Sequence, residues 1–113
     1  MNKKNNKILR NYITLSGKAP FKDWLYNLKD PTIRHRIRRR LDRVEIGNYG
    51  DYKPLGDGVY ELKLHFGSGY RVYFAEDGDI IVILLCGGDK NSQSKDIEVA
   101  KAYWKELLER NNE

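Results

Sequence analysis

Cysteine and histidine are scarce in this sequence, and it has no long hydrophobic run. The single cysteine, Cys86, excludes an intrachain disulfide and a zinc site built from several cysteines. The two histidines, His35 and His65, have no metal-ligand spacing around them, so we expect no metal site. The longest apolar run, residues 80–86, is too short to cross a bilayer, and the polar, basic first residues are unlike a secretory signal. We therefore expect a cytoplasmic protein with no membrane partner.

Length and charge indicate one globular domain with a basic surface. At 113 residues the chain has room for a single hydrophobic core, and we expect residues 1–113 to form one domain. The 21 lysines and arginines exceed the 16 acidic residues, which gives a net charge of +5. Six arginines fall between Arg34 and Arg43, whereas the acidic residues are scattered. Such a basic face suggests a polyanionic partner, or an acidic protein that imitates one.

The hydrophobic pattern predicts elements in the order β-α-α-β-β-β-α. They are a strand at 8–15, helices that begin at Pro20 and Pro31, a hairpin within 58–76, a buried strand at 79–86 and a helix at about 96–109. Residues 48–57 are rich in Gly, Asn and Asp, and we expect a connecting loop there. The order predicts a small α+β domain with a mainly antiparallel sheet. A helical hairpin should cover one face of the sheet and leave the other partly open.

The second predicted helix has an apolar stripe bordered by arginines. Asp30 is a good N-cap residue, and Gly47 can end the helix. Most of the arginines, including Arg36 and Arg43, lie outside the stripe, either as an ordinary solvated face or as a binding surface for RNA. Arg40 falls within the apolar arc. It must therefore reach past the core edge, or pair with a carboxylate or a phosphate.

The stretch Gly58–Glu76 alternates like a two-faced β-hairpin around a Gly-Ser-Gly loop. If Phe66 pairs with Tyr70 across that loop, His65 lies opposite Arg71. One face of the hairpin is then apolar. The other face gathers five polar residues: Glu61, Lys63, His65, Arg71 and Tyr73.

The residue types on the polar face suit RNA cleavage without a metal. In that reaction the 2′-hydroxyl attacks its own phosphate, so the protein must remove one proton, stabilise a phosphorane and protonate the leaving 5′-oxygen. Glu61 or His65 can act as the base, while Arg71 and Lys63 can stabilise the phosphorane. Each residue taken singly also fits the solvated face of an ordinary hairpin.

Two turns frame the last predicted strand. Asp77-Gly78 is typical of a type I′ turn before it, and Gly87-Gly88 should lead out of it as a flexible loop rather than as a phosphate loop. Lys90 follows that loop and can reach the polar face. Tyr73 or Tyr70 can stack on a base or hold a phosphate oxygen there.

Three segments carry a family resemblance. They are FKDWLYNLKD, GNYGDYKPLGDGVYELKLHFGSGYRVYF and IIVILLCGGDKNSQSKDIEVAKAYW, which together span about Phe21 to Trp104. The chain resembles the phage-derived, HigB-like addiction-module killer proteins of the RelE/ParE toxin superfamily. The resemblance implies a RelE-like fold, and a type II toxin neutralised by a small antitoxin, usually a helix-turn-helix protein encoded beside it. For RelE-like members it implies cleavage of mRNA on the ribosome without a cofactor.

The resemblance also assigns roles at individual positions. Lys63 occupies the place of a basic residue on the first hairpin strand, but Glu61 stands where a lysine is expected. Arg71 matches the arginine that binds phosphate after Gly-Tyr, and Lys90 stands in for the arginine expected after the last strand. The C-terminal catalytic tyrosine of RelE has no counterpart around residues 96–97. With these substitutions, either Glu61 or His65 remains open as the base.

Two other functions remain as alternatives. The first is a ParE-like protein that inhibits DNA gyrase by binding to it. ParE-like proteins lack a catalytic set of residues on the sheet, so the polar face of this chain favours the ribonuclease. A regulator that binds nucleic acid only with its partner is the other alternative. The sequence has no DNA-reading motif, and its acidic residues are scattered, so this alternative has less support.

Overall fold

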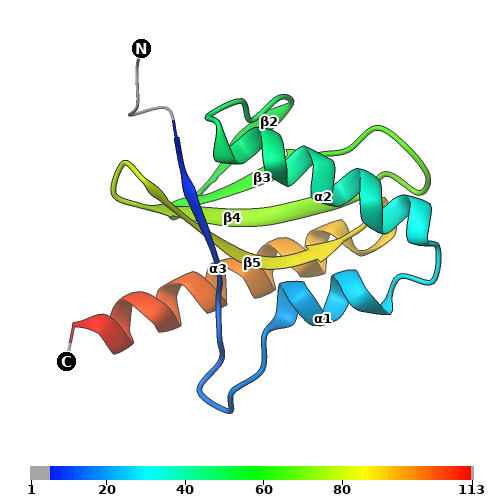
Figure 1. The fold of residues 1–113 in the computed structure, drawn as a ribbon. Coiled ribbons are helices and arrows are strands. Elements are labelled where there is room, and N and C mark those ends of the chain that lie inside the picture. The colour runs from blue at the N-terminus through cyan, green and yellow to red at the C-terminus, as the bar shows by residue number, and fades with distance from the viewer. Residues whose placement is uncertain (1–5, 113) are drawn as a thin grey trace.

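The computed structural model describes residues 6–112, and it confirms the predicted α+β class (Figure 1). The elements are β1 (Ile8–Asn11), α1 (Pro20–Asn27), α2 (Pro31–Glu45), β2 (Tyr52–Gly56), β3 (Val59–Lys63), β4 (Arg71–Asp77), β5 (Ile81–Gly88) and α3 (Gln93–Asn111), with a short 3₁₀ turn, η2 (Lys90–Ser92), before α3.

One five-stranded sheet of order β1-β5-β4-β3-β2 forms the middle of the molecule. β1 pairs with β5 in parallel, and the other three pairs are antiparallel. The sheet is therefore mainly antiparallel, as predicted, and β5 lies inside it between β1 and β4. No helix in the described part of the chain is long and apolar enough to cross a membrane.

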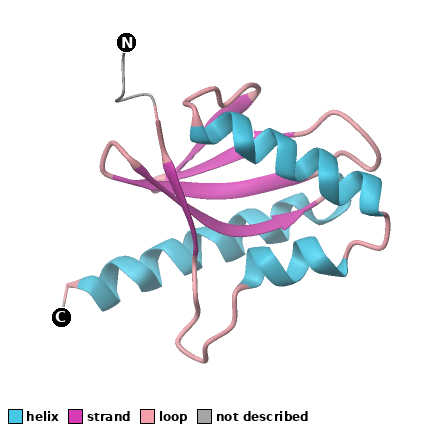
Figure 2. Cartoon of the chain, viewed as in Figure 1, coloured by secondary structure: helices cyan, strands magenta, loops and turns pink. Residues whose placement is uncertain are grey.

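Helices cover both faces of the sheet, so the expectation of a partly open second face was wrong. α1 and α2 lie on one face and the long α3 lies on the other (Figure 2). Each face has its own apolar core, because alternate residues of a strand point to opposite faces. The core under α1 and α2 includes Phe21, Leu25, Ile37, Leu41, Leu62, Val72 and Phe74. The core under α3 includes Val59, Tyr73, Ala75, Leu85, Ala100 and Trp104.

The predicted connecting loop at 48–57 contains a strand, β2, which the pattern missed. β2 joins β3 through Asp57-Gly58, whose φ angles are +58° and +82°. Positive φ at both central residues defines the type I′ turn. The type I′ prediction at Asp77-Gly78 was wrong, since Asp77 pairs with Ile81 around a three-residue loop. Asp57 is the one non-glycine residue of positive φ in the described chain.

The register of the β3–β4 hairpin also differs from the prediction. Lys63 pairs with Arg71, and the Leu64 amide donates to the Tyr70 carbonyl at 2.9 Å. Residues 65–69 therefore form a longer loop than a three-residue turn. His65 projects from this loop and does not lie opposite Arg71. The change frees His65 from the sheet, and 72% of its side chain is exposed.

β5 continues through the two glycines that we expected to form a flexible loop. A Cβ on Gly87 would lie 2.3 Å from the Trp24 ring, and one on Gly88 would lie 1.8 Å from a carboxylate oxygen of Asp96. Glycine here allows α1 and α3 to approach the strand from opposite sides. β1 is shorter than predicted and ends at Asn11.

α2 begins as predicted, with the Asp30 carboxylate accepting from the Thr32 amide at 2.8 Å. The bonding of Arg40 was not among the options considered. Its guanidinium donates to three backbone carbonyls, those of Tyr49, Asp51 and Lys63, at 2.7–2.9 Å. Arg40 therefore ties α2 to the segment before β2 and to the end of β3.

Candidate nucleic-acid interface

Two adjoining cavities lie beside α2, where β3 ends and β4 begins. One has a volume of about 360 Å³ and is lined by Arg36, Arg39, Arg40, Arg43, Leu64, His65 and Phe66. The other, of about 350 Å³, is lined by Lys63, Leu64, His65, Phe66, Gly67, Gly69, Arg71 and Lys90. We call them the arginine cavity and the lysine cavity. They share the segment Leu64–Phe66, and none of the described residues that line them is acidic.

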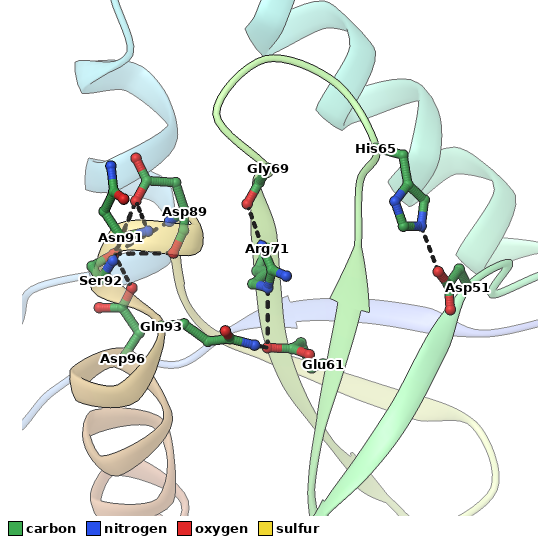
Figure 3. Close-up of polar contacts among 10 residues, drawn as sticks. All are labelled: Asp51, Glu61, His65, Gly69, Arg71, Asp89, Asn91, Ser92, Gln93 and Asp96. Carbon is green, nitrogen blue, oxygen red and sulfur yellow. Dashed lines mark hydrogen bonds and ion pairs between the residues drawn. The ribbon is translucent and has the colours of Figure 1, made fainter.

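His65 stands at this shared segment and is held by Asp51. Its Nε2 lies 2.5 Å from the Asp51 carboxylate, so Nδ1 is the ring nitrogen left for a substrate (Figure 3). The hydrogen bond with His65 holds the pKa of Asp51 below its ordinary value. A carboxylate in this position fixes the orientation and tautomer of the imidazole. The pair has the geometry of an oriented general base.

Arg40 fixes the backbone that carries Asp51. Burial lowers the pKa of Arg40 from its ordinary value, and the neighbouring Arg43 charge adds to this effect. Arg40 was predicted to bind RNA, either by reaching past the core edge or by pairing with a phosphate. Its donors instead bind backbone carbonyls, although its side chain still lines the arginine cavity.

Arg71 lies in the lysine cavity and is held on two sides. Its Nη1 donates to the Gly69 carbonyl at 2.6 Å, and its Nε lies 3.5 Å from the Glu61 carboxylate (Figure 3). The same Glu61 oxygen accepts a hydrogen bond from the Gln93 side chain at 2.9 Å. Only 14% of the Arg71 side chain is exposed, at the edge that faces the cavity. A guanidinium fixed in this way is preorganised to bind a phosphate.

Glu61 and Tyr73 are enclosed, so the expectation that they lie on an open face was wrong. Both have 0% exposure, because α3 lies over the strand face that carries them. Burial, and then the Glu61 charge, raise the pKa of Tyr73. The Tyr73 hydroxyl and one Glu61 oxygen have no hydrogen-bond partner among the described residues. In this structure neither residue can touch a polynucleotide on the surface.

The other candidates lie around the two cavities. Lys63 and Lys90 line the lysine cavity, and Arg36 and Arg43 line the arginine cavity. The Arg36 guanidinium lies 3.9 Å from the centre of the Phe66 ring. Seven of the nine predicted residues therefore line the two cavities: Lys63, His65, Arg71, Lys90, Arg36, Arg40 and Arg43.

Sequence reasoning missed Asp51 and Gln93. Asp51 lies in the segment interpreted as a loop, and Gln93 opens α3 earlier than the expected start of that helix. No local pattern marks either residue, since their partners are 14 and 32 positions away along the chain. Among the described residues, no three histidine, cysteine or acidic side chains gather as a metal site.

Comparison with known proteins identifies relatives over most of the chain. The model of the phage-derived protein Gp49-like family matches residues 23–107. This range includes every residue that lines the two cavities. An uncharacterized protein of Haemophilus influenzae (strain Rd) is 46% identical over 95 residues. That alignment covers 84% of this chain and 96% of the relative.

Proposed function

Since the chain belongs to the phage-derived Gp49-like family, a RelE/HigB-like toxin family, we propose that it is an endoribonuclease that cleaves mRNA on the ribosome. The family is associated with the toxins of toxin–antitoxin systems, which implies an antitoxin partner. As part of the proposal, that antitoxin is a helix-turn-helix protein encoded by the adjacent gene. The enzyme needs no cofactor.

One observation carries the proposal. An imidazole oriented by a carboxylate stands between two cavities lined by cations and by no acidic residue. Cations attract a polyanion, and the oriented imidazole of His65 lies where the backbone of that polyanion would pass. Ribonuclease chemistry requires these groups together, whereas binding to a protein target would not require the oriented base.

The groups can divide the reaction as follows. Nδ1 of His65 takes the proton of the 2′-hydroxyl, and the 2′-oxygen forms a bond to its own phosphorus. Arg71 and Lys90 stabilise the extra charge of the phosphorane. The bond from phosphorus to the 5′-oxygen then breaks, and the Lys63 ammonium gives that oxygen a proton. The products are a 2′,3′-cyclic phosphate and a free 5′-hydroxyl.

Glu61 has a different role from the one that its residue type suggested. It is too enclosed to be the base, but it lies against Arg71 and accepts from Gln93. We assign it to positioning Arg71. Arg43 and Arg36 bind the RNA strand beyond the cleaved bond. Arg40 holds Asp51 in place through its hydrogen bond to the Asp51 backbone carbonyl. Tyr73 has no RNA contact in this mechanism.

Controlled expression in bacteria tests the proposal. The wild-type protein should stop growth, lower amino-acid incorporation before thymidine incorporation, and create new 5′ ends within translated mRNA. His65→Ala should lower the cleavage rate by about 10²- to 10⁴-fold, because it removes the general base. Arg71→Ala should also relieve the arrest. Lys105→Ala removes an exposed α3 charge outside both cavities and should leave cleavage intact.

The unfolding midpoints of the purified variants show whether each one is still folded. If growth stops while mRNA ends are unchanged and the chromosome is cleaved, the protein acts on DNA gyrase and the ribonuclease proposal is wrong. If His65→Ala and Arg71→Ala remain folded and fully active, the assigned site is wrong even where RNA is cleaved.

A further inference from the structure

The Arg36 guanidinium lies over an aromatic ring at the boundary between the two cavities. Its guanidinium carbon is 3.9 Å from the centre of the Phe66 ring. We propose that Arg36 and Phe66 form a subsite on which one unpaired RNA base stacks. This inference rests on the proposed function, because it assigns a place to one nucleotide of that substrate.

The location of Phe66 makes it a point that an RNA strand must cross. Phe66 lines both cavities, and each cavity holds cations that can bind phosphate: Arg39 and Arg43 in one, Arg71 and Lys90 in the other. A strand with one phosphate in each cavity carries the nucleotide between them over the Phe66 segment. Its base therefore lies near the Arg36–Phe66 pair.

The Phe66 ring is held in place by the hydrophobic core and by neighbouring aromatic rings. Phe66 is partly buried and packs against the core under α1 and α2. Its ring centre lies 5.7 Å from that of Tyr70, which in turn lies 6.3 Å from that of Trp24. These contacts fix the plane on which Arg36 rests. Arg36 itself is exposed, so the side of the guanidinium turned away from Phe66 is open to a ligand.

The chemistry of this pair selects a single-stranded base. A guanidinium is planar and stacks on aromatic rings and on nucleobases, whereas a lysine ammonium carries the same charge without a plane. A base in a duplex has both faces covered by its neighbours, so only an unstacked base can use the subsite. The stack accepts any base, because every base has a π face.

Binding of short single-stranded RNA tests the subsite. The RNA carries 2′-O-methyl groups so that it cannot be cleaved, and an abasic nucleotide replaces each position in turn. With the full-length wild-type protein, one abasic position should weaken binding by at least about fivefold. Arg36→Lys should weaken binding of the 2′-O-methyl RNA that has no abasic nucleotide by a similar factor. In Arg36→Lys, the same abasic position should cause no further loss.

Arg38→Lys is the matched control. Arg38 is also an α2 arginine over an aromatic ring, 5.0 Å from the centre of Tyr26, but it lines neither cavity. Its replacement should leave RNA affinity unchanged. Phe66→Leu should reproduce the loss seen with Arg36→Lys, provided that its unfolding midpoint matches that of the wild type.

Three results would overturn the inference. The first is an abasic scan in which no position matters. The second is an equal loss in Arg36→Lys and Arg38→Lys. The third is an abasic penalty that persists unchanged in Arg36→Lys. If the wild-type protein binds RNA and any of these is found, the proposed function stands without the stacking subsite. If the wild-type protein binds no RNA, the stacking subsite is wrong, and the proposed function is decided separately by the mRNA ends that form during growth arrest.

Discussion

Asp51 and His65 are both largely exposed, yet each restricts the other. Their side chains are 53% and 72% exposed and lie 2.5 Å apart. Solvent screens the charge between them, so the pair contributes little to folding. Its effect is orientation, because the imidazole keeps Nε2 on the carboxylate and presents Nδ1 to the cavities. The residue pair therefore belongs to the chemistry of the site and not to the core.

Asp51→Asn should separate orientation from folding. The amide keeps the shape of the carboxylate but loses its charge and can also donate, so His65 loses its fixed orientation and tautomer. We expect cleavage of mRNA in a translation extract to fall by up to about 10²-fold while the unfolding midpoint is unchanged. Asp57→Asn, at an aspartate whose side chain is 75% exposed, should cleave normally. Equal rates for Asp51→Asn and the wild type would remove Asp51 from the mechanism.

Glu61 has no exposed surface, and a buried carboxylate is costly unless it is paired. Its partners Arg71 and Gln93 supply that pairing. Glu61→Gln should lower the free energy of unfolding by about 1–3 kcal/mol, measured in urea. It should also weaken growth arrest, because Arg71 loses its restraint. Glu98→Gln makes the same charge change at an exposed α3 position and should stay within about 0.5 kcal/mol of wild type. A fully stable, fully toxic Glu61→Gln would contradict the positioning role.

The sequence placed these residues on the correct face but could not predict their exposure. Strand alternation puts Glu61, Lys63, Arg71 and Tyr73 on one face, and they share a face in the structure. The register differs from the prediction, since Glu61 pairs with Tyr73 and Lys63 with Arg71. Whether that face is open depends on where α3 docks, and no local pattern specifies docking. Lys63 and Arg71 remain accessible because they lie at the strand ends, where the cover by α3 stops.

At the scale of elements, glycine and proline signals were correct for helices and misleading for strands. Pro20 and Pro31 begin helices as predicted, because proline suits the first helical turn. β2 was missed because Pro54 and several glycines and aspartates resemble a loop. β2 is an edge strand, where proline is tolerated. Its pairing with β3 depends on the Asp57-Gly58 turn, which the pattern assigned to the wrong Asp-Gly pair.

The junction between β5 and α3 controls how Gln93 reaches the site. Gly88→Ala would place a methyl group 1.8 Å from an Asp96 carboxylate oxygen and 2.8 Å from the Ser92 hydroxyl, so these side chains or α3 itself must shift. We expect a loss of about 1–3 kcal/mol in urea unfolding and a weaker growth arrest. The double variant Gly88→Ala/Asp96→Ala should recover part of that stability, since the closest clashing atoms, those of the Asp96 carboxylate, are gone. Additive losses in the double variant would show that the contact does not limit packing.

For the whole molecule, the net charge of +5 matters less than where the cations lie. The arginines of α2 were predicted as a group from sequence, and the structure places Arg36 and Arg43 beside the strand ends. What the sequence could not provide is the meeting of α2 with the 65–69 loop. That meeting arises from the packing of α2 on the sheet and from the three carbonyl bonds of Arg40.

The interior also predicts how stability depends on alkaline pH. Burial, and then the Asp96 charge, raise the pKa of the Cys86 thiol from 9.0 to about 12, while burial and a hydrogen bond to Glu106 raise that of Tyr12 from 10.0 to about 12. A raised pKa means that the folded state favours the neutral group. The stabilisation is therefore complete below the unfolded pKa and is lost as pH rises towards the folded one.

Between pH 9.0 and 10.0, Cys86 is the first of these groups to deprotonate in the unfolded chain. The free energy of unfolding should fall there by up to about 1 kcal/mol, since one proton changes stability by at most about 1.4 kcal/mol per pH unit. Cys86→Ala should flatten this part of the curve and keep the steeper decline above pH 10.0, where the tyrosines titrate. Urea unfolding at a series of pH values measures both slopes. An unchanged slope in Cys86→Ala would mean that the thiol is not held neutral by the fold.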